Sequence, residues 1–130
     1  MSITLGYVLA YVPDVPRALA FWEQAFGLER RFLHVSNAYA ELETGATALG
    51  FVSEPVAEAN GGVFRANRAS ELPAGIEVAL CVPDVGAAFA RAVGAGATPV
   101  KAPTTKPWGQ TVAYVRDPDG LLVELCTRMG

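Results

Sequence analysis

One four-residue sequence occurs twice in this chain, and the repetition constrains the fold more than any other feature. Val-Pro-Asp-Val stands at residues 12–15 and again at 82–85. Each copy follows a run typical of a β-strand and precedes an apolar pattern with helical spacing. The aspartate of each copy suits a helix N-cap, because its side chain can accept a hydrogen bond from a free backbone N–H. The repeated order of elements predicts a duplicated module.

The first module is expected to contain a strand, a helix and three short strands. Residues 3–12 read as a buried strand, and the following helix is predicted to end at Gly27. The spacing of its large apolar residues places them on one helix face: Val15, Leu19, Trp22 and Phe26. Three short strands are expected after it, at residues 30–35, 38–43 and 46–52.

The second module repeats this order. A strand at 75–82 precedes a helix, a strand near 98–101 and a loop at 102–108, and a hairpin closes the chain. The hairpin turn is Asp-Pro-Asp-Gly at 117–120, a combination typical of tight turns. We therefore predict an α+β fold with two tandem βαβββ modules in one structural domain. The expected ranges are 1–53 for the first module, 54–74 for a connector and 75–130 for the second module.

Composition excludes several classes of function. Hydrophobic residues make up 52% of the 130 residues, which is enough for a packed core. A net charge of -3 without a basic stripe argues against nucleic-acid binding. No apolar run approaches the roughly 20 residues of a membrane span, and no basic, signal-like segment begins the chain. Cys81 and Cys126 are expected to be reduced core thiols, so we predict a cytoplasmic protein.

Three stretches together resemble the vicinal oxygen chelate superfamily. They are the two Val-Pro-Asp-Val copies, FWEQAFGLE at 21–29 and PWGQTVAYVRDPDGLLVEL at 107–125. This superfamily includes glyoxalase I, extradiol dioxygenases, fosfomycin resistance enzymes and bleomycin resistance proteins. The resemblance implies a cupped mixed sheet with the helices outside. It is strongest to the bleomycin-resistance-like branch, which lacks a full metal site.

The resemblance also implies where metal ligands would stand, namely on the first and last strands of both modules. Aligning the two Val-Pro-Asp-Val copies matches Tyr7 with Glu77. Aligning Gly45 with Gly120 then matches Leu49 with Glu124. Leucine cannot donate and a neutral phenol is a poor ligand, so we expect no cofactor and no catalytic metal. Two carboxylates alone would allow a weakly held divalent ion.

The only histidine, His34, lies where the resemblance implies no ligand, and is interpreted as a surface residue. Strand alternation places Glu77 and Glu124 on the same faces as Cys81 and Cys126. Neighbouring carboxyls raise each other's pKa, so such a pair could bind a cation or serve as general acid and base. Trp108 has two interpretations: it stacks on a flat or cationic ligand, or it packs its loop against the sheet.

We therefore predict a small-molecule binding protein without a catalytic metal, acting as a homodimer. The expected binding residues are Tyr7, Leu49, Phe51, Glu77, Trp108, Gln110 and Glu124. One alternative is a glyoxalase-like, metal-dependent lyase or isomerase with Glu124 as base and Glu77 as its partner, the only case in which these two are catalytic. Another alternative is an antibiotic-sequestering resistance protein.

Overall fold

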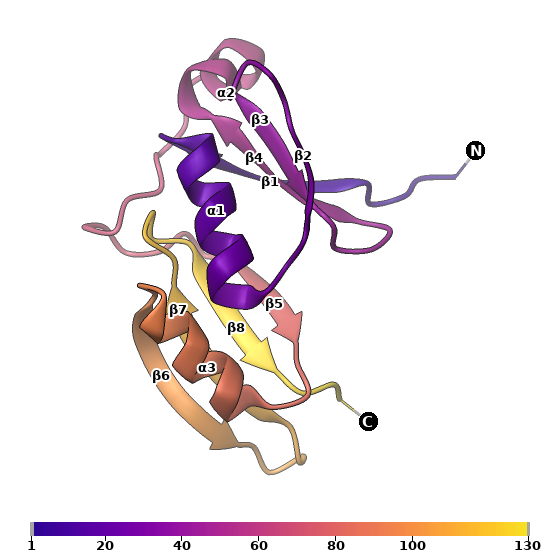
Figure 1. Cartoon of the computed structure of the whole chain (residues 1–130), viewed down its shortest axis with the longest axis vertical. Helices are drawn as coiled ribbons and strands as arrows, with labels where there is room; N and C mark the ends of the chain where they lie inside the picture. The colour runs from indigo at the N-terminus through magenta and orange to yellow at the C-terminus, as the bar shows by residue number, and fades with distance from the viewer. Residues whose placement is uncertain (1, 130) are drawn as a thin grey trace. The chain divides into compact units, whose positions relative to one another are not determined.

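The computed structural model describes residues 2–129, which form eight strands and three helices (Figure 1). In chain order the elements are β1 (Tyr7–Val12), α1 (Val15–Phe26), β2 (Arg30–Leu33), β3 (Tyr39–Leu42), β4 (Ala48–Ser53), α2 (Glu54–Gly61), β5 (Glu77–Cys81), α3 (Val85–Gly94), β6 (Thr98–Thr105), β7 (Thr111–Arg116) and β8 (Leu122–Cys126). The chain divides into two compact units, Met1–Ala66 and Asn67–Gly130, and each is described by itself.

Both units have the same sheet topology, which confirms the predicted α+β fold of two tandem βαβββ modules. The strand orders are β1-β4-β3-β2 and β5-β8-β7-β6. In each sheet the first and last strands of the module are parallel neighbours, and the other pairs are antiparallel. One helix covers one face of each sheet, α1 in the first unit and α3 in the second (Figure 1). The opposite face is called the open face below.

The repeated Val-Pro-Asp-Val sequence produces the same helix start twice. The Asp14 side chain accepts a hydrogen bond from the Arg17 backbone N–H at 3.1 Å, and Asp84 accepts one from Ala87 at 3.0 Å. Each cap satisfies a donor that a helix N-terminus leaves free. Both N-caps are extended, with φ of -141° at Asp14 and -135° at Asp84.

The predicted core face of the first helix is confirmed except at Phe26, which is half-buried with its ring 4.7 Å from that of Trp22. Val15, Leu19 and Trp22 are buried, and the Trp22 ring lies 5.8 Å from the Phe51 ring of β4. Gly27 ends the helix with φ 68°, a left-handed conformation that glycine adopts without a Cβ penalty. This packing fixes which face of the first sheet is covered.

Three details differ from the sequence expectations. The strand predicted over 3–12 begins only at Tyr7, and its first half is exposed because β1 is an edge strand with β4 as its one neighbour. β6 continues to Thr105, so the loop expected from 102 begins later. Residues 54–61 of the predicted connector form helix α2.

The cysteines and the membrane expectation can also be compared with the structure. Both thiols are free, but only Cys126 is buried, so the prediction of two core thiols is wrong for Cys81. The reason is again the edge position, since β5 has β8 as its only neighbour in the sheet. Across residues 2–129, no helix combines the length and apolar character that a membrane crossing requires.

Candidate functional site

Two glutamates lie together on the open face of the second sheet. In the parallel ladder of β5 and β8, Glu77 pairs with Leu122 and Ala79 pairs with Glu124, so both acids project from the same face. The protonated Glu77 carboxyl donates a hydrogen bond to Glu124, and this bond, followed by burial and the Glu124 charge, raises the pKa of Glu77 to about 7. A hydrogen bond between two carboxyl groups needs a proton between them. The pair therefore holds one proton below about pH 7.

A phenol completes this acidic cluster. Tyr114 on β7 pairs across the ladder with Glu124, and its hydroxyl donates to Glu124 Oε1 at 3.3 Å. Burial, and then the charges of Glu124 and Glu77, raise the pKa of Tyr114, so its hydroxyl keeps its proton. Arg116 belongs to the same face by alternation. Its guanidinium does not pair with the acids there, because it donates to the Glu71 carbonyl at 2.7 Å and to the Gly120 carbonyl at 2.9 Å.

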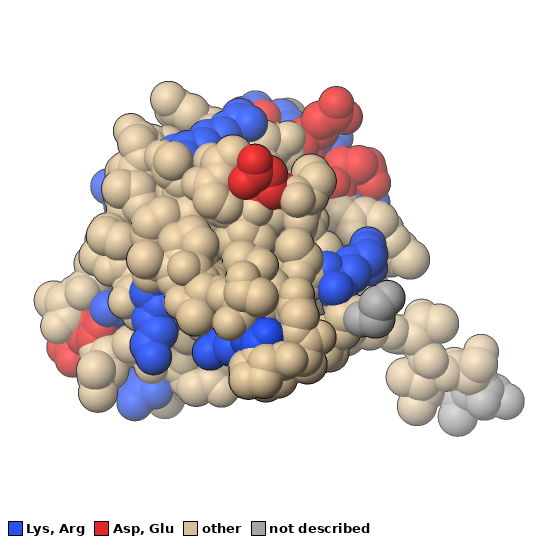
Figure 2. All heavy atoms as spheres, turned by 90° about the horizontal axis from the view of Figure 1, so that it is seen from below, with Lys and Arg blue, Asp and Glu red and all other residues tan. Residues whose placement is uncertain are grey.

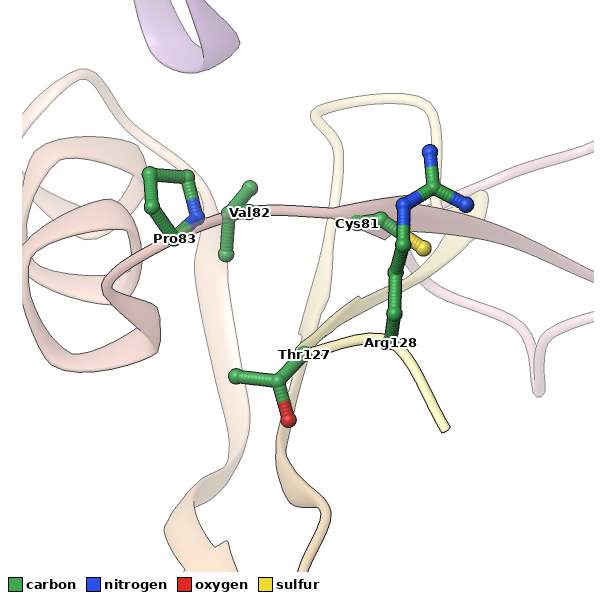
Figure 3. Close-up of a pocket in the computed structure, with 5 residues that line it drawn as sticks. All are labelled: Cys81, Val82, Pro83, Thr127 and Arg128. Atoms are coloured by element: carbon green, nitrogen blue, oxygen red, sulfur yellow. The ribbon is translucent and has the colours of Figure 1, made fainter. Parts of the chain in front are cut away.

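Two thiols continue the same face beyond the acids. Cys81 and Cys126 are direct partners in the β5–β8 ladder, and the Cys126 thiol donates to the Leu80 carbonyl at 3.7 Å. Burial first, and the Cys81 thiol second, raise the pKa of Cys126 to about 11. An open hollow of about 390 Å³ begins beside them, where β5 and β8 end (Figure 3). Its lining residues are Cys81, Val82, Pro83, Thr127 and Arg128.

The loop between β6 and β7 is tied to the end of β8. The Trp108 Nε1–H donates to Gln110 Oε1 at 3.0 Å, and Gln110 Nε2 donates to the Thr127 carbonyl at 2.8 Å. Trp108 is 64% exposed, so its ring faces outward and does not pack beneath the loop. This arrangement leaves an indole available for stacking, and the binding role of Trp108 and Gln110 stays a prediction.

The strand register corrects the alignment of the two modules by one residue. Tyr7 pairs with Ala48 and Leu9 with Gly50, as Glu77 pairs with Leu122 and Ala79 with Glu124. The first-unit equivalent of Glu124 is therefore Gly50, and the matching of Glu124 with Leu49 is wrong. The cause is turn length. The last hairpin pairs are Leu42 with Leu49 and Arg116 with Leu122, so the first connection is one residue longer.

This shift decides where two predicted binding residues lie. Phe51 is buried against Trp22 of α1, and Leu49 shares its face by strand alternation. Both therefore lie on the helix side of the first sheet. Tyr7 projects from the open face of that sheet and is 59% exposed. The structure brings Glu77 and Glu124 together in the second unit, whereas Leu49, Phe51 and Tyr7 belong to two different faces of the first.

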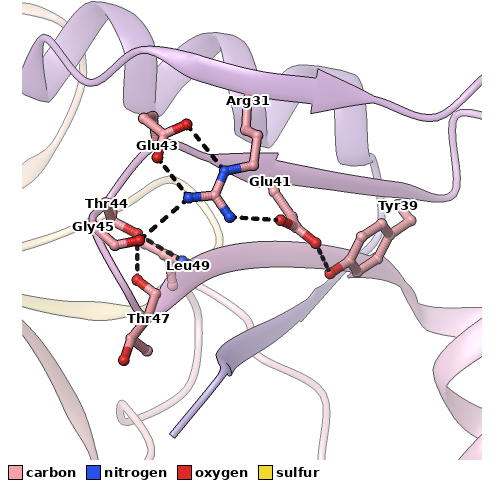
Figure 4. Close-up of polar contacts among 8 residues, drawn as sticks. All are labelled: Arg31, Tyr39, Glu41, Glu43, Thr44, Gly45, Thr47 and Leu49. Atoms are coloured by element: carbon pink, nitrogen blue, oxygen red, sulfur yellow. Dashed lines mark hydrogen bonds and ion pairs between the residues drawn. The ribbon is translucent and has the colours of Figure 1, made fainter.

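Sequence reasoning missed a buried carboxylate on the open face of the first sheet. Glu41 is 6% exposed; it accepts a hydrogen bond from the Tyr39 hydroxyl at 2.6 Å and one from Arg31 at 3.3 Å (Figure 4). Arg31 also pairs with Glu43 through its Nε at 3.0 Å. Burial, and next the Glu41 carboxylate, raise the pKa of Tyr39. The first unit thus has its own pair of a phenol and a carboxylate.

A signal for Glu41 was present in the sequence. Tyr39, Glu41 and Glu43 alternate with Ala40 and Leu42, a pattern that separates a polar face from an apolar one. The room for this cluster comes from Gly50, the ladder partner of Glu41. A Cβ at Gly50 would stand 2.9 Å from the Ala40 carbonyl oxygen and 3.4 Å from the Tyr39 hydroxyl.

The donors at the four family positions do not fit a catalytic metal. Corrected by the register, these positions hold Tyr7, Gly50, Glu77 and Glu124. Glycine offers no side-chain donor, and the two glutamates hydrogen-bond to each other. Among the residues that the structure describes, no group of three or more His, Cys, Asp or Glu side chains could hold an ion. His34 is exposed and contacts Ser36 Oγ at 2.8 Å, as expected of a surface histidine.

The two βαβββ modules have the same strand connectivity, and each has a polar cluster on the open face of its sheet. These features define a class of small α+β proteins built from two tandem modules. The chain belongs to the Glyoxalase/Bleomycin resistance protein/Dioxygenase superfamily, whose family model matches residues 4–125. A search of curated proteins gives no significant match.

Solved structures share the fold of this chain at low sequence identity. A glyoxalase-related enzyme from Fulvimarina pelagi has a TM-score of 0.83 at 20% identity, over 96% of this chain and 88% of that one. A family enzyme from Burkholderia phytofirmans PsJN has a TM-score of 0.79 at 22% identity, over 96% and 98%. TioX from Micromonospora sp. ML1 has a TM-score of 0.73 at 24% identity, over 98% and 100%. At these identities the likeness shows the fold alone.

Proposed function

We propose that this protein binds a small molecule on the open face of its second sheet, without a catalytic metal. The observation that carries the proposal is the hydrogen-bonded pair of Glu77 and Glu124 on a strand face that Cys126 and Tyr114 make partly apolar. Paired carboxyls in such surroundings are uncommon unless they serve a ligand or a reaction. Glu77 is exposed, so a ligand can reach the pair from solvent.

The chemistry of the pair selects the class of ligand. Two carboxyls that hold one proton carry about one negative charge, which favours an organic cation or a group with several N–H donors. The exposed indole of Trp108 adds a flat surface that attracts cations and aromatic rings. We therefore propose a small aromatic or amine-bearing cation. The bulky cationic antibiotic of a sequestering protein is one member of this class.

A binding assay with charge-matched ligands tests this proposal. Isothermal titration would compare aromatic amines with neutral compounds of the same shape, on wild type, Glu124→Gln and the control Glu58→Gln. Glu58 is exposed on α2 in the other unit. We expect cations to bind wild type and the control alike, and to bind Glu124→Gln at least about tenfold more weakly, as for a lost charge-assisted hydrogen bond. Equal binding of the neutral compounds, or no effect of Glu124→Gln, would contradict the proposal.

A second candidate function is acid–base catalysis by a glyoxalase-like lyase or isomerase. The pKa of Glu77, about 7, favours it, because a general acid or base works best near the ambient pH. The test is turnover of hemithioacetals by wild type and Glu124→Gln, with and without added divalent metals. Equal rates for the two proteins would remove Glu124 from any mechanism. Turnover that appears only with metal would instead support the metal-dependent alternative.

Other partners follow from the surface and the sheet edges. On the face shown in Figure 2, Lys and Arg side chains are interspersed with Asp, Glu and uncharged side chains and form no continuous basic stripe, which supports a small-molecule ligand over a nucleic acid. β1 and β5 are edge strands, and pairing between copies would cover their main-chain groups. We retain the expectations of a homodimer and a cytoplasmic location. Light scattering across a concentration series tests the homodimer, and a constant monomer mass would contradict it.

A further inference from the structure

The two cysteines of this chain occupy opposed positions on adjacent strands. Cys81 is the last residue of β5 and Cys126 the last of β8, and the two are direct partners in the parallel ladder. Neighbouring strands lie about 4.8 Å apart. A disulfide joins residues whose Cα atoms are about 4.4–6.8 Å apart. Side chains at partner positions of a ladder share a face, so the spacing and direction suit a disulfide.

The two thiols stand at partner positions of the ladder and differ in access. Cys81 helps to raise the pKa of Cys126, which indicates that the two side chains are close. Cys81 is exposed, whereas Cys126 is 5% exposed. Immediately after them the Val82 N–H donates to the Cys126 carbonyl at 2.8 Å, and this bond fixes the two chain segments beside each other. One thiol can therefore meet a reagent from solvent, and the other can meet only the first thiol.

The hollow at the ends of β5 and β8 gives a small reagent a place to approach. Cys81, Thr127 and Arg128 are among the residues that line it (Figure 3). The Arg128 guanidinium that lines the same hollow attracts an anionic reagent. The charged and titratable side chains near the two thiols are Arg128, Glu124 and Tyr114.

We propose that Cys81 and Cys126 form a thiol–disulfide exchange site, in which Cys81 reacts with a low-molecular-weight disulfide and Cys126 resolves the product. The Cys81 thiolate attacks one sulfur of the small disulfide, whose S–S bond breaks and releases one thiolate. The Cys126 sulfur, on losing its proton to water, then attacks the Cys81 sulfur. The new bond is Cys81–Cys126, and the second small thiol leaves. Two protein thiols are oxidised and one small disulfide is reduced to two thiols.

The Cys81–Cys126 site is separate from the Glu77–Glu124 pair but lies on the same open face of the second sheet. A disulfide would add a covalent link between β5 and β8 at the end of their ladder. It would also change the surroundings of Glu124, because both nearby thiols would become a disulfide and the Cys126 sulfur would turn toward Cys81. Oxidation is thus expected to rigidify the second sheet and alter the wall of the hollow. This consequence does not depend on which ligand the protein binds.

Intact-protein mass spectrometry with oxidised glutathione tests the proposal. The wild-type chain would be compared with Cys81→Ser and Cys126→Ser, under native conditions, with time points from seconds to hours. Wild type is expected to lose two hydrogen masses, with Cys81 linked to Cys126 in the peptide map. Cys126→Ser is expected to retain one glutathionyl group on Cys81. Cys81→Ser is expected to react at least about tenfold more slowly, because Cys126 is buried.

Several results would overturn the proposal. One is a wild-type protein that keeps a stable glutathionyl adduct and forms no Cys81–Cys126 bond. A second is a disulfide that forms only between two copies of the chain. A third is glutathionylation of the two single variants at equal rates. Peptide mapping of the wild type alone keeps the test valid if Cys126→Ser fails to fold. In that case a native wild-type chain with both thiols free after prolonged exposure would count against the proposal.

Discussion

At the scale of single residues, the proton shared by Glu77 and Glu124 has a measurable consequence for stability. The folded chain holds the Glu77 proton up to a pKa of about 7, above its ordinary value of 4.5. Between these two values the folded state binds more protons than the unfolded state, so stability falls as pH rises. The contribution is complete below pH 4.5 and lost above about 7. The effect should be small, because solvent screens an exposed carboxyl.

The variant Glu77→Gln isolates this effect. Denaturant unfolding of wild type and variant at several pH values should show the wild type losing stability relative to Glu77→Gln across that window. Glu58→Gln serves as the control, and its curve should run parallel to that of the wild type. If the wild type instead gains stability with pH relative to Glu77→Gln, the pair does not share a proton.

The Tyr39–Glu41 contact makes a second residue-scale prediction. Tyr39→Phe removes the 2.6 Å hydrogen bond to a buried carboxylate and leaves Glu41 with Arg31 at 3.3 Å. Loss of a donor to a buried charged acceptor costs about 1–3 kcal/mol. Urea unfolding should show this loss for Tyr39→Phe and almost none for Tyr7→Phe, whose ring is 59% exposed. Equal stabilities of the two variants would mean that Glu41 is satisfied without Tyr39.

At the scale of elements, the sequence determined the order of strands and helices but not the register of one hairpin. The two Val-Pro-Asp-Val copies and their caps predicted both helices, and the Asp-Pro-Asp-Gly turn predicted the final hairpin. Register depends on how many residues a turn contains, and a glycine in each turn does not reveal that number. The one-residue difference turned Leu49 toward α1 and put Gly50 beside Glu41. Burial of Glu41 required the ladder itself, which local sequence does not specify.

The two hairpin glycines offer a matched test at the element scale. Gly45 and Gly120 have φ of 94° and 90°, where a Cβ is strained by about 1–3 kcal/mol. A Cβ at Gly45 meets nothing within 4 Å, whereas one at Gly120 would stand 2.5 Å from Arg116 Nη2 and 2.6 Å from the Arg68 carbonyl oxygen. Gly45→Ala should therefore show the backbone strain alone.

Gly120→Ala should cost more, because Arg116 and the segment it holds must move. Arg116 Nη2 donates to the Glu71 carbonyl at 2.7 Å, so displacement of its side chain releases residues 68–71. Thermal unfolding measures the difference between the two variants, and proteolysis at residues 68–71 reports the released segment. Equal melting temperatures, with no new cleavage, would show that the Arg116 contact adds nothing to the turn.

At the scale of the whole molecule, the two units share a topology but differ in how their cores are filled. The first unit completely buries Trp22, Phe51, Leu19 and Leu42, whereas the largest such side chains in the second are Leu125, Val115 and Val123. Its one helical aromatic, Phe89, is only half-buried. Complete burial of a large apolar side chain contributes about 1.5–3 kcal/mol. Equal topology therefore does not imply equal local stability.

Native-state hydrogen exchange should reveal this difference. Amides of β3 and β4 are expected to exchange at least about tenfold more slowly than those of β7 and β8, since 1.4 kcal/mol corresponds to tenfold. Peptides from 63–67, which carry no ladder, provide the fast reference. Slower exchange in β7 and β8 than in β3 and β4 would contradict the expectation, and would mean that the open face of the second sheet is covered in solution. Hydrogen exchange of the oxidised chain would then distinguish a covered sheet face from a Cys81–Cys126 disulfide. A disulfide slows exchange in β5 and β8 more than in β7.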